Sequence, residues 1–187
     1  EKPENIEVWT DSDFAGCQKS RKSTSGGVIR HGQHIIKSWS TNQAVIALSS
    51  GEAEYYALVK GVSGAIGITN LCKDLGMIKE GPIRAKTDAS AAIGIASRLG
   101  VGKVRHIEVN QLWLQQKVYD KSVEILKVPT EENLADVLTK AVDSGKLRKH
   151  IEDINAWTSK DRHQLTPGLD YGKQEEEEEE EEVEEEE

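Results

Sequence analysis

The stretch VIALSSGEAEYYALVKG, residues 45–61, marks the point where the period of the sequence changes. Before it, short segments of alternating polarity are typical of strands; after Ser49, small and apolar side chains recur at helical spacing. The recurring positions are Ala57, Leu58, Gly61, Val62, Ala65, Ile68 and Leu71 or Cys72. They predict one long helix, from Ser49 to about Gly76, with a buried stripe of small residues.

Two glutamates stand one residue apart at the start of this helix, and helical geometry separates their tasks. Side chains two positions apart on a helix point about 200° away from each other. Ser49 and Glu52 have the S-x-x-E form of a capping box, in which Glu52 reaches back to the backbone N–H of Ser49. Glu54 lies one turn before Leu58, at the head of the buried stripe, where a carboxylate is costly unless it meets a cation. We therefore predict a partner cation for Glu54.

The remaining elements follow from strand and helix periodicity and from the positions of glycine and proline. We predict strands at 6–13, 82–90 and 123–128, a hairpin at 23–41 that turns near 31–34, helices at 91–99, 105–120 and 133–142, and a further helical region at 144–157. Ser90 is placed to cap the helix that follows it. The order β-β-β-α-β-α-α-β-α predicts an α/β fold, a mixed sheet with helices packed on its faces.

Charge is distributed unevenly along the chain. The formal charge is −9, but residues 175–187 alone hold 12 glutamates. The other residues contain 24 Lys and Arg against 21 Asp and Glu, which leaves a formal +3. Such a glutamate run cannot bury apolar area, so we expect a domain at 1–158, with the motifs in 6–142, and a disordered acidic tail at 159–187. The mildly basic remainder permits a polyanionic partner.

Composition argues against several other classes. Cys17 and Cys72 lie far apart without partner spacing, which favours reduced thiols in an intracellular compartment over a disulfide scaffold. The histidines offer no pair at zinc-site spacing apart from His31 and His34, which flank the predicted turn. No apolar run approaches the ~20 residues of a membrane span. The first residues show neither an initiator Met nor a signal peptide, and we expect a soluble piece of a larger protein that makes no membrane contact.

Further carboxylates stand at the ends of elements that can converge on Glu54. Asp11 follows the first strand and Asp88 follows the strand after the long helix, and residues at adjacent strand ends commonly line a site. Asp136 lies in the first turn of the last predicted helix if Asn133 is its cap. The alternative, in which these aspartates are turn or cap residues, stays open. Several carboxylates without a compensating Lys or Arg favour hard divalent ions, for which Mg²⁺ is the natural choice.

Several segments of the sequence indicate a protein family when they are taken together. In chain order they are TDSDFAG with RKSTSGG, then KSWSTNQAVIALSSGEAEYYAL, AKTDASAAI and VPTEENLADVLTK, and they cover roughly residues 8–142. Together they resemble the ribonuclease H domain of copia-type LTR retrotransposon Pol polyproteins. The resemblance implies a ribonuclease H-like mixed five-stranded sheet flanked by helices. It also implies two Mg²⁺ ions, replaceable by Mn²⁺, on the catalytic metal ligands Asp11, Glu54, Asp88 and Asp136.

An activity and partners follow from the same resemblance. It implies an endonuclease that hydrolyses the RNA strand of RNA–DNA hybrids during reverse transcription, next to an upstream reverse transcriptase domain of the same polyprotein. The expected location is intracellular, in a cytoplasmic retrotransposon particle or the nucleus. Asp13 is interpreted as a turn residue. The expected substrate contacts are Ser12, Arg21, Lys22, Ser23, Thr24, Arg105 and Asn133. For the basic residues among them, the alternative is a charge that is simply solvated.

The chain also departs from the family. Leu112 stands where related sequences usually have His, Ala89 stands where they have Asn, and the loop VPTEEN lacks the His of cellular ribonucleases H. These changes concern His-assisted product release, not the predicted ligands. Two alternatives stay open: a catalytically silent nucleic-acid-binding member of the fold, and a domesticated host protein whose acidic tail recruits basic partners. An integrase-like nuclease would place its glutamate last, whereas Glu54 lies between two of the aspartates.

Overall fold

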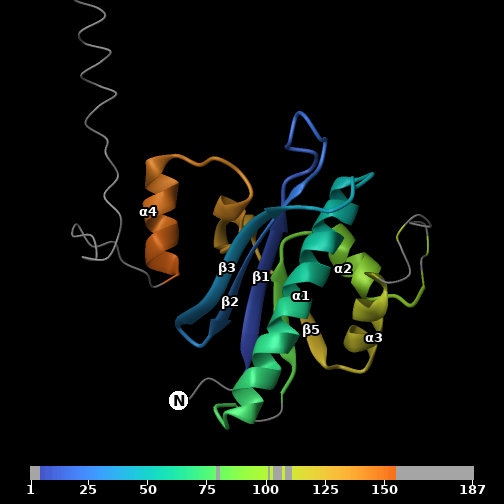
Figure 1. Cartoon of the computed structure of the whole chain (residues 1–187), viewed down its shortest axis with the longest axis vertical. Coiled ribbons are helices and arrows are strands. Elements are labelled where there is room, and N and C mark those ends of the chain that lie inside the picture. Colours follow the sequence, from blue (N-terminus) through green and yellow to red (C-terminus); the bar gives the residue numbers. More distant parts are fainter. Residues whose placement is uncertain (1–4, 79–80, 101, 103–106, 108–110, 155–187) are drawn as a thin grey trace, which may run out of the picture. The chain divides into compact units, whose positions relative to one another are not determined.

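A five-stranded sheet organises the chain in the computed structural model, which describes residues 5–78, 81–100, 102, 107 and 111–154 (Figure 1). The strands are β1 (Ile6–Ser12), β2 (Thr24–His31), β3 (His34–Asn42), β4 (Ile83–Thr87) and β5 (Val123–Lys127). The helices are α1 (Ser50–Asp74), α2 (Ser90–Ala96), α3 (Trp113–Tyr119) and α4 (Ser144–Asp153), with short 3₁₀ turns η2 (Thr130–Glu132) and η3 (Asp136–Leu138). The predicted α/β class and the predicted order of the elements are confirmed.

The sheet has the order β3-β2-β1-β4-β5 and is mixed. β1 pairs with β2 antiparallel, and β2 pairs likewise with β3. β4 lies parallel to β1 on its other side, followed by β5. Because parallel strands end at the same edge of a sheet, Asp11 near the end of β1 and Asp88 directly after β4 come to neighbouring positions.

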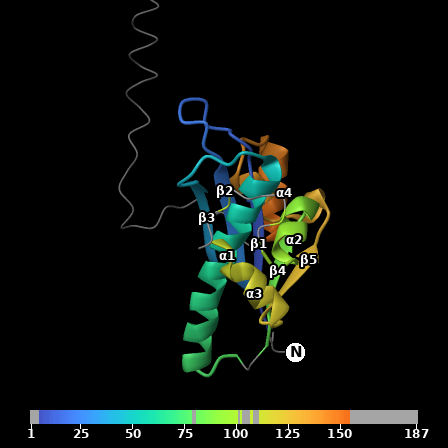
Figure 2. The ribbon, with the colours of Figure 1, turned by 90° about the vertical axis from the view of Figure 1, so that its right-hand side faces the viewer.

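Helices cover both faces of the sheet (Figures 1 and 2). One face packs against α1, α2 and α3, and the main core between them includes Tyr55, Leu58 and Leu114, all fully buried. A smaller cluster lies on the other face, where Trp9 and Val28 contact Leu134 and Ala135 from the segment between β5 and α4. Burial of these apolar side chains supplies the main stabilisation of the fold.

Helix α1 crosses β1 unusually closely, and Gly61 makes this approach possible. A Cβ atom at Gly61 would lie 2.4 Å from Cγ2 of Thr10 and 3.1 Å from Cγ2 of Val8. Any larger side chain there would push the helix away from the strand. Gly61 lies two turns after Glu54, so this contact brings the first turns of α1 toward the end of β1, where Asp11 lies.

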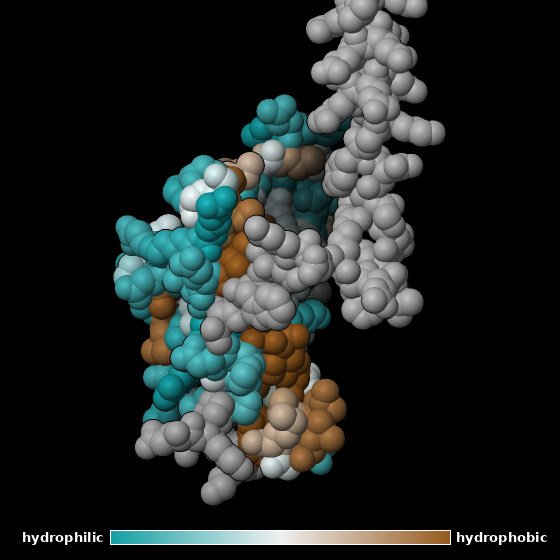
Figure 3. Space-filling model, turned by 90° about the vertical axis from the view of Figure 1, so that its left-hand side faces the viewer, coloured by the Kyte–Doolittle hydropathy of each residue, from teal (hydrophilic) through white to brown (hydrophobic). Residues whose placement is uncertain are grey.

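Exposed hydrophobic side chains gather at the far end of α1. Leu71, Leu75 and Met77 are each more than half exposed. Figure 3 shows hydrophobic surface both along the middle and at the lower end of the face that it views. The end of α1 that carries these residues is opposite to the end that carries Glu54. None of the helices in the described part of the chain combines the length and the hydropathy needed to cross a bilayer.

Two local predictions were wrong. Ser90 is the first residue of α2 and not its cap; the cap is Ala89, without a side-chain hydrogen bond, while the Ser90 hydroxyl accepts a hydrogen bond from Lys127 (2.7 Å). The segment 133–142 forms no α-helix, because its residues make one 3₁₀ turn, η3, and side-chain contacts to the sheet instead. The start of the predicted helix at 105–120 lies mostly outside the described residues, and its described part is helical from Trp113.

Candidate metal centre

Three carboxylates from distant parts of the sequence converge at one edge of the sheet. Asp11 comes from β1, Glu54 from the first turns of α1, and Asp88 from the position after β4. Each offers one oxygen, and these oxygens all lie within 4.8 Å of one another. Asp11 is buried and the other two are half-buried. Among the described residues, none of the three forms an ion pair with a lysine or an arginine. The predicted convergence is therefore observed.

Each of these carboxylates has one oxygen that accepts a hydrogen bond from the protein. The pairs are Oδ2 of Asp11 with the hydroxyl of Thr139, Oε1 of Glu54 with the backbone N–H of Ser12 at 3.2 Å, and Oδ2 of Asp88 with the hydroxyl of Thr130 at 2.7 Å. The second oxygen of Glu54, Oε2, is buried and has no hydrogen-bond partner among the described residues. One oxygen of each carboxylate is thus held, while the other is available to a ligand.

The environment disfavours the ionised form of two of these groups. Burial raises the pKa of Glu54 to about 8, and the neighbouring charge of Asp11 adds to the rise. Burial likewise raises the pKa of Asp11 to about 6; the Thr139 hydrogen bond opposes this, and Asp88 and Asp136 reinforce it. Such shifts arise where carboxylates are removed from water and crowded together, and the charge of Lys140 only partly offsets them at Asp11. A cation placed between them would reverse both effects.

The donor set fits a hard divalent cation. All donors are carboxylate oxygens, which Mg²⁺ and Ca²⁺ prefer, and no described histidine or cysteine belongs to the group. Oε2 of Glu54 is the decisive atom, because a buried carboxylate oxygen without a partner is costly unless it ligates a cation. Asp11, Glu54 and Asp88 can therefore hold a divalent metal ion.

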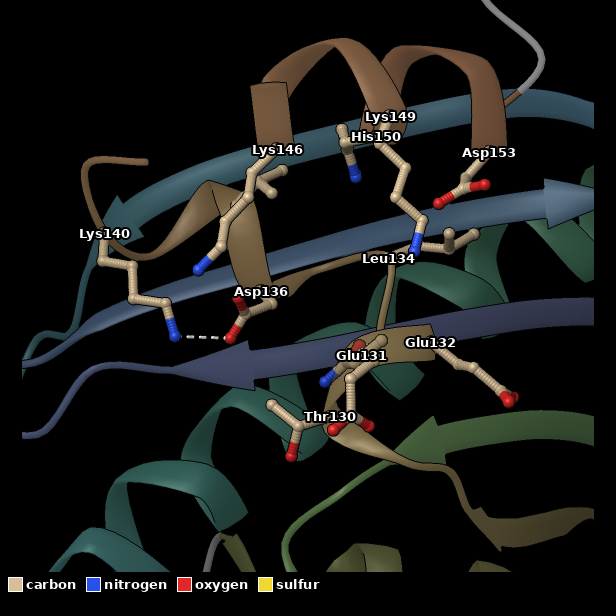
Figure 4. Close-up of a pocket in the computed structure, with 12 residues that line it drawn as sticks. Thr130, Glu131, Glu132, Leu134, Asp136, Lys140, Lys146, Lys149, His150 and Asp153 are labelled. Carbon is tan, nitrogen blue, oxygen red and sulfur yellow. Dashed lines mark hydrogen bonds and ion pairs between the residues drawn. The ribbon is translucent and has the colours of Figure 1, made fainter. Parts of the chain in front are cut away.

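Asp136 lies outside this group of three. Its Oδ1 accepts a hydrogen bond from Nζ of Lys140 at 2.6 Å (Figure 4). It also lines a cavity of about 320 Å³ between α4 and the η2–η3 segment, to which Lys146 and Lys149 contribute as well. The charge of Asp136 nevertheless reaches Asp11, whose pKa it helps to raise. The role of Asp136 as a fourth ligand stays a prediction.

Glu52 has the structural task that the sequence predicts, with one change in its partner. The Ser49 side chain caps α1 by accepting a hydrogen bond from the Glu52 N–H (3.2 Å). The Glu52 carboxylate accepts from the N–H of Leu48 (2.9 Å) and the hydroxyl of Tyr56 (2.6 Å), and not from the N–H of Ser49. Glu52 is also almost fully buried. It anchors the chain that enters the helix and takes no part in the acidic group.

The loop between β1 and β2 carries three of the seven predicted substrate contacts, and a fourth follows it at the start of β2. Arg21 is exposed and Lys22 half-buried, and neither pairs with an acidic side chain in the described part of the chain. Ser23 is buried and its hydroxyl accepts a hydrogen bond from the Ala15 N–H (3.0 Å), so it holds the loop together. Thr24 begins β2 and its hydroxyl donates to Asn42 (3.3 Å). These residues stay predictions as substrate contacts.

Three other predicted residues have distinct positions. The Ser12 hydroxyl is buried without a hydrogen-bond partner among the described residues, next to Glu54. Arg105 lies outside the described residues. Asn133 is buried, and its amide donates to the carbonyl of Thr10 (3.0 Å), so it ties the η2–η3 segment to β1. The role of Asn133 as a substrate contact stays a prediction.

Asp13 is a loop residue, as interpreted from the sequence. Its side chain accepts a hydrogen bond from the backbone N–H of Thr24, and its own N–H donates to the Thr24 carbonyl (3.1 Å). Two residues that contact the acidic group, Thr130 and Thr139, were not predicted. Both lie in the segment VPTEENLADVLTK, which also contains Asp136, and this was the signal that could have found them.

Comparisons with known proteins give relatives for most of the domain. No family model matches the chain. The retrovirus-related Pol polyprotein from transposon TNT 1-94 of Nicotiana tabacum is 32% identical over 142 residues, which are 75% of this chain and 11% of that protein. The retrovirus-related Pol polyprotein from transposon RE1 of Arabidopsis thaliana is 27% identical over 137 residues, or 73% of this chain and 9% of that protein. The chain thus spans about a tenth of the length of these relatives.

A solved structure gives the fold. The N-terminal ribonuclease H domain of a Mycobacterium tuberculosis protein, solved as a fusion with maltose-binding protein, matches with a TM-score of 0.51 and 16% identity over 78% of this chain and 97% of that chain. The chain therefore has the ribonuclease H fold, as predicted. Its sequence relatives are retrovirus-related Pol polyproteins of plant transposons, and the resemblance to a copia-type ribonuclease H domain is confirmed.

Proposed function

We propose that this domain is a divalent-metal-dependent endonuclease that hydrolyses the RNA strand of RNA–DNA hybrids. The observation that carries the proposal is the convergence of Asp11, Glu54 and Asp88 without an ion-pair partner among the described residues. Crowded, partly buried carboxylates destabilise a metal-free domain, so a purely structural role explains them poorly. The ribonuclease H fold and the Pol relatives support this class of hydrolase over other metal-binding functions.

The proposed cofactor is Mg²⁺, in two ions, with Mn²⁺ as a substitute, because all donors are carboxylate oxygens. When bound, such ions activate the attacking water and stabilise the leaving 3′ oxygen. Asp11, Glu54 and Asp88 would hold them through the oxygens that make no hydrogen bond within the protein. Asp136 is the proposed fourth ligand, through the oxygen other than Oδ1, which accepts the hydrogen bond from Lys140.

The substrate surface proposed here begins at the loop between β1 and β2. Arg21 and Lys22 lie ten and eleven residues after Asp11 and offer positive charge to a phosphate backbone. Discrimination of the RNA strand would come from contacts to its 2′-hydroxyl groups. The Pol relatives support a retrotransposon polyprotein as the context of this domain. The proposed role is in reverse transcription beside an upstream reverse transcriptase domain, and the proposed location is a cytoplasmic particle or the nucleus.

A cleavage assay on end-labelled duplexes tests this function. The domain should cut an RNA–DNA hybrid in Mg²⁺ or Mn²⁺ and stop in EDTA, and it should leave double-stranded DNA and single-stranded RNA intact. Glu54→Gln should bind the hybrid without cutting it. If the unaltered domain binds hybrid but never cuts it under any divalent ion, the alternative of a catalytically silent nucleic-acid-binding module replaces the proposal.

A further inference from the structure

We propose that Thr139 is a positioning residue of the acidic site, which orients the Asp11 carboxylate for metal binding, and that Thr130 does the same more weakly for Asp88. This inference rests on the proposed function, because the orientation of these carboxylates matters only if they hold a cation. Neither threonine is itself one of the three carboxylates. Each acts through the carboxylate oxygen to which its hydroxyl donates a hydrogen bond.

The contact of Thr139 with Asp11 is well protected. Thr139 is buried, with an exposed fraction of 7%, and its hydroxyl donates to Oδ2 of Asp11. The same hydroxyl oxygen lies 3.0 Å from the carbonyl oxygen of Asp136, so two acceptors share a single proton. The hydroxyl therefore links the strand that carries the first carboxylate to the turn that carries the fourth predicted ligand.

A glycine in β2, Gly26, leaves room for the segment that carries Thr139. Gly26 pairs directly with Asp11 across β1 and β2. A Cβ atom at Gly26 would lie 2.8 Å from Cγ2 of Thr139 and 3.0 Å from the carbonyl oxygen of Ala135. The η3 segment can thus lie against the sheet only because residue 26 has no side chain.

A second attachment holds the same segment in register. The amide of Asn133 donates to the carbonyl of Thr10, the residue directly before Asp11. Asn133 and Thr139 therefore bind successive residues of β1 from both ends of the segment between them. Two attachments on neighbouring residues restrict sliding of the segment, so the Thr139 hydroxyl meets the carboxylate in one geometry.

The chemical effect is on the orientation of the carboxylate. A carboxylate without a partner rotates about its terminal bond and must be fixed when it binds a metal. With Oδ2 held by Thr139, Oδ1 of Asp11 remains for the cation. Hydrogen-bonding partners of metal ligands typically contribute 10–100-fold to metal affinity. Thr130 is exposed and water can replace its hydroxyl, so its contribution to Asp88 should be smaller.

Isothermal titration of the metal-free domain with Mg²⁺, and separately with Mn²⁺, tests the inference. Thr139→Val keeps the shape and removes the hydroxyl, and it should weaken metal binding about tenfold. Thr139→Ser keeps the hydroxyl and should bind as the unaltered domain does. Thr69→Val is the matched control, because Thr69 has the same exposed fraction of 7% and its hydroxyl has no partner among the described residues. It should leave metal affinity unchanged.

Further outcomes separate this inference from the proposed function. If Thr139→Val does not fold, Thr139→Ala takes its place and is compared with Thr139→Ser. If Asp11→Asn abolishes metal binding but loss of the Thr139 hydroxyl leaves it unchanged, Thr139 has no positioning role and the metal site stands. If Asp11→Asn and Glu54→Gln bind Mg²⁺ as the unaltered domain does, the metal site itself is wrong. In hybrid cleavage, Thr139→Val should raise the Mg²⁺ concentration of half-maximal rate about tenfold, with Thr139→Ser restoring it.

Discussion

The backbone N–H of Ser12 donates a hydrogen bond to Oε1 of Glu54 at 3.2 Å, while Oε2 of the same carboxylate is buried without a partner among the described residues. This contact joins the end of β1 to the first turns of α1. Glu54 belongs to the acidic group with Asp11 and Asp88, so the oxygen without a partner among the described residues is the one available to a cation. Glu52, two residues earlier, is buried and accepts hydrogen bonds from Leu48 and Tyr56, but it does not belong to the acidic group.

Substitutions that keep the shape of the acidic side chains should separate the two glutamates. Asp11→Asn, Glu54→Gln and Asp88→Asn should each abolish Mg²⁺-dependent hybrid cleavage, because each removes a negative ligand from the group. Glu52→Gln should remain active and lose about 1 kcal/mol of unfolding free energy, through its contacts with Leu48 and Tyr56. Gel assays and urea unfolding measure the two effects. An inactive Glu52→Gln beside an active Glu54→Gln would reverse the assignment.

The stability of the metal-free domain should fall as pH rises. Burial raises the pKa of Glu54 to about 8 and that of Asp11 to about 6, above the values of 4.5 and 3.8 for these side chains in water. The folded state thus keeps protons that the unfolded chain has released. This stabilisation is fully present below about pH 4 and is lost as pH rises through about 6 to 8. Glu54→Gln should be more stable than the unaltered domain above pH 8 by on the order of 2 kcal/mol.

Thermal unfolding in EDTA between pH 4 and pH 9 measures this dependence. Saturating Mg²⁺ should raise the unfolding temperature most at the alkaline end, because the metal binds the deprotonated carboxylates. An unfolding temperature that stays level or rises with pH in EDTA would show that these carboxylates are not destabilised in the metal-free fold.

The close approach of α1 to β1 should be needed for the site. Gly61→Val should cost about 2 kcal/mol or more of unfolding free energy and weaken Mg²⁺ binding, because its Cβ would lie 2.4 Å from the Thr10 methyl group and displace the helix that carries Glu54. Gly67→Ala is the matched control in the same helix, since no atom lies within 4 Å of its added Cβ. It should gain up to about 1 kcal/mol from helix propensity. Unchanged metal affinity in a folded Gly61→Val domain would refute the link.

The acidic tail should compete with nucleic acid for the basic surface. Residues 175–187, which lie outside the described part of the chain, hold 12 glutamates, and their mutual repulsion favours an extended chain. Deleting them should tighten hybrid binding at low ionic strength, with the difference shrinking as salt rises, because both interactions are screened. Fluorescence anisotropy measures the dissociation constants. A tail with glutamine at all 12 positions is the control and should behave like the deletion; equal constants for all three chains would leave the tail without this role.

The order of the elements and the assignment of Glu54 could be predicted because both depend on local patterns. Helical spacing after Ser49 and the cap formed by that residue separate Glu52 from Glu54 within one turn of chain. Strand ends likewise placed Asp11 and Asp88 at one edge of the sheet. Where a pattern was ambiguous, as for Ser90 and the segment 133–142, tertiary contacts prevailed over local propensity.

By itself the sequence determined the class of fold, the family resemblance and three carboxylates that meet, since periodicity and motif order need no knowledge of distant contacts. Only the tertiary structure decided how those carboxylates are held. The partner of Asp11 is Thr139, 128 residues away, and no local spacing records such a pair. Asn133 became an anchor of the η2–η3 segment for the same reason, because its amide meets Thr10 only after β1 and that segment have packed together. Hydrogen bonds between distant segments form only when the whole chain packs together, so no short stretch of sequence predicts them.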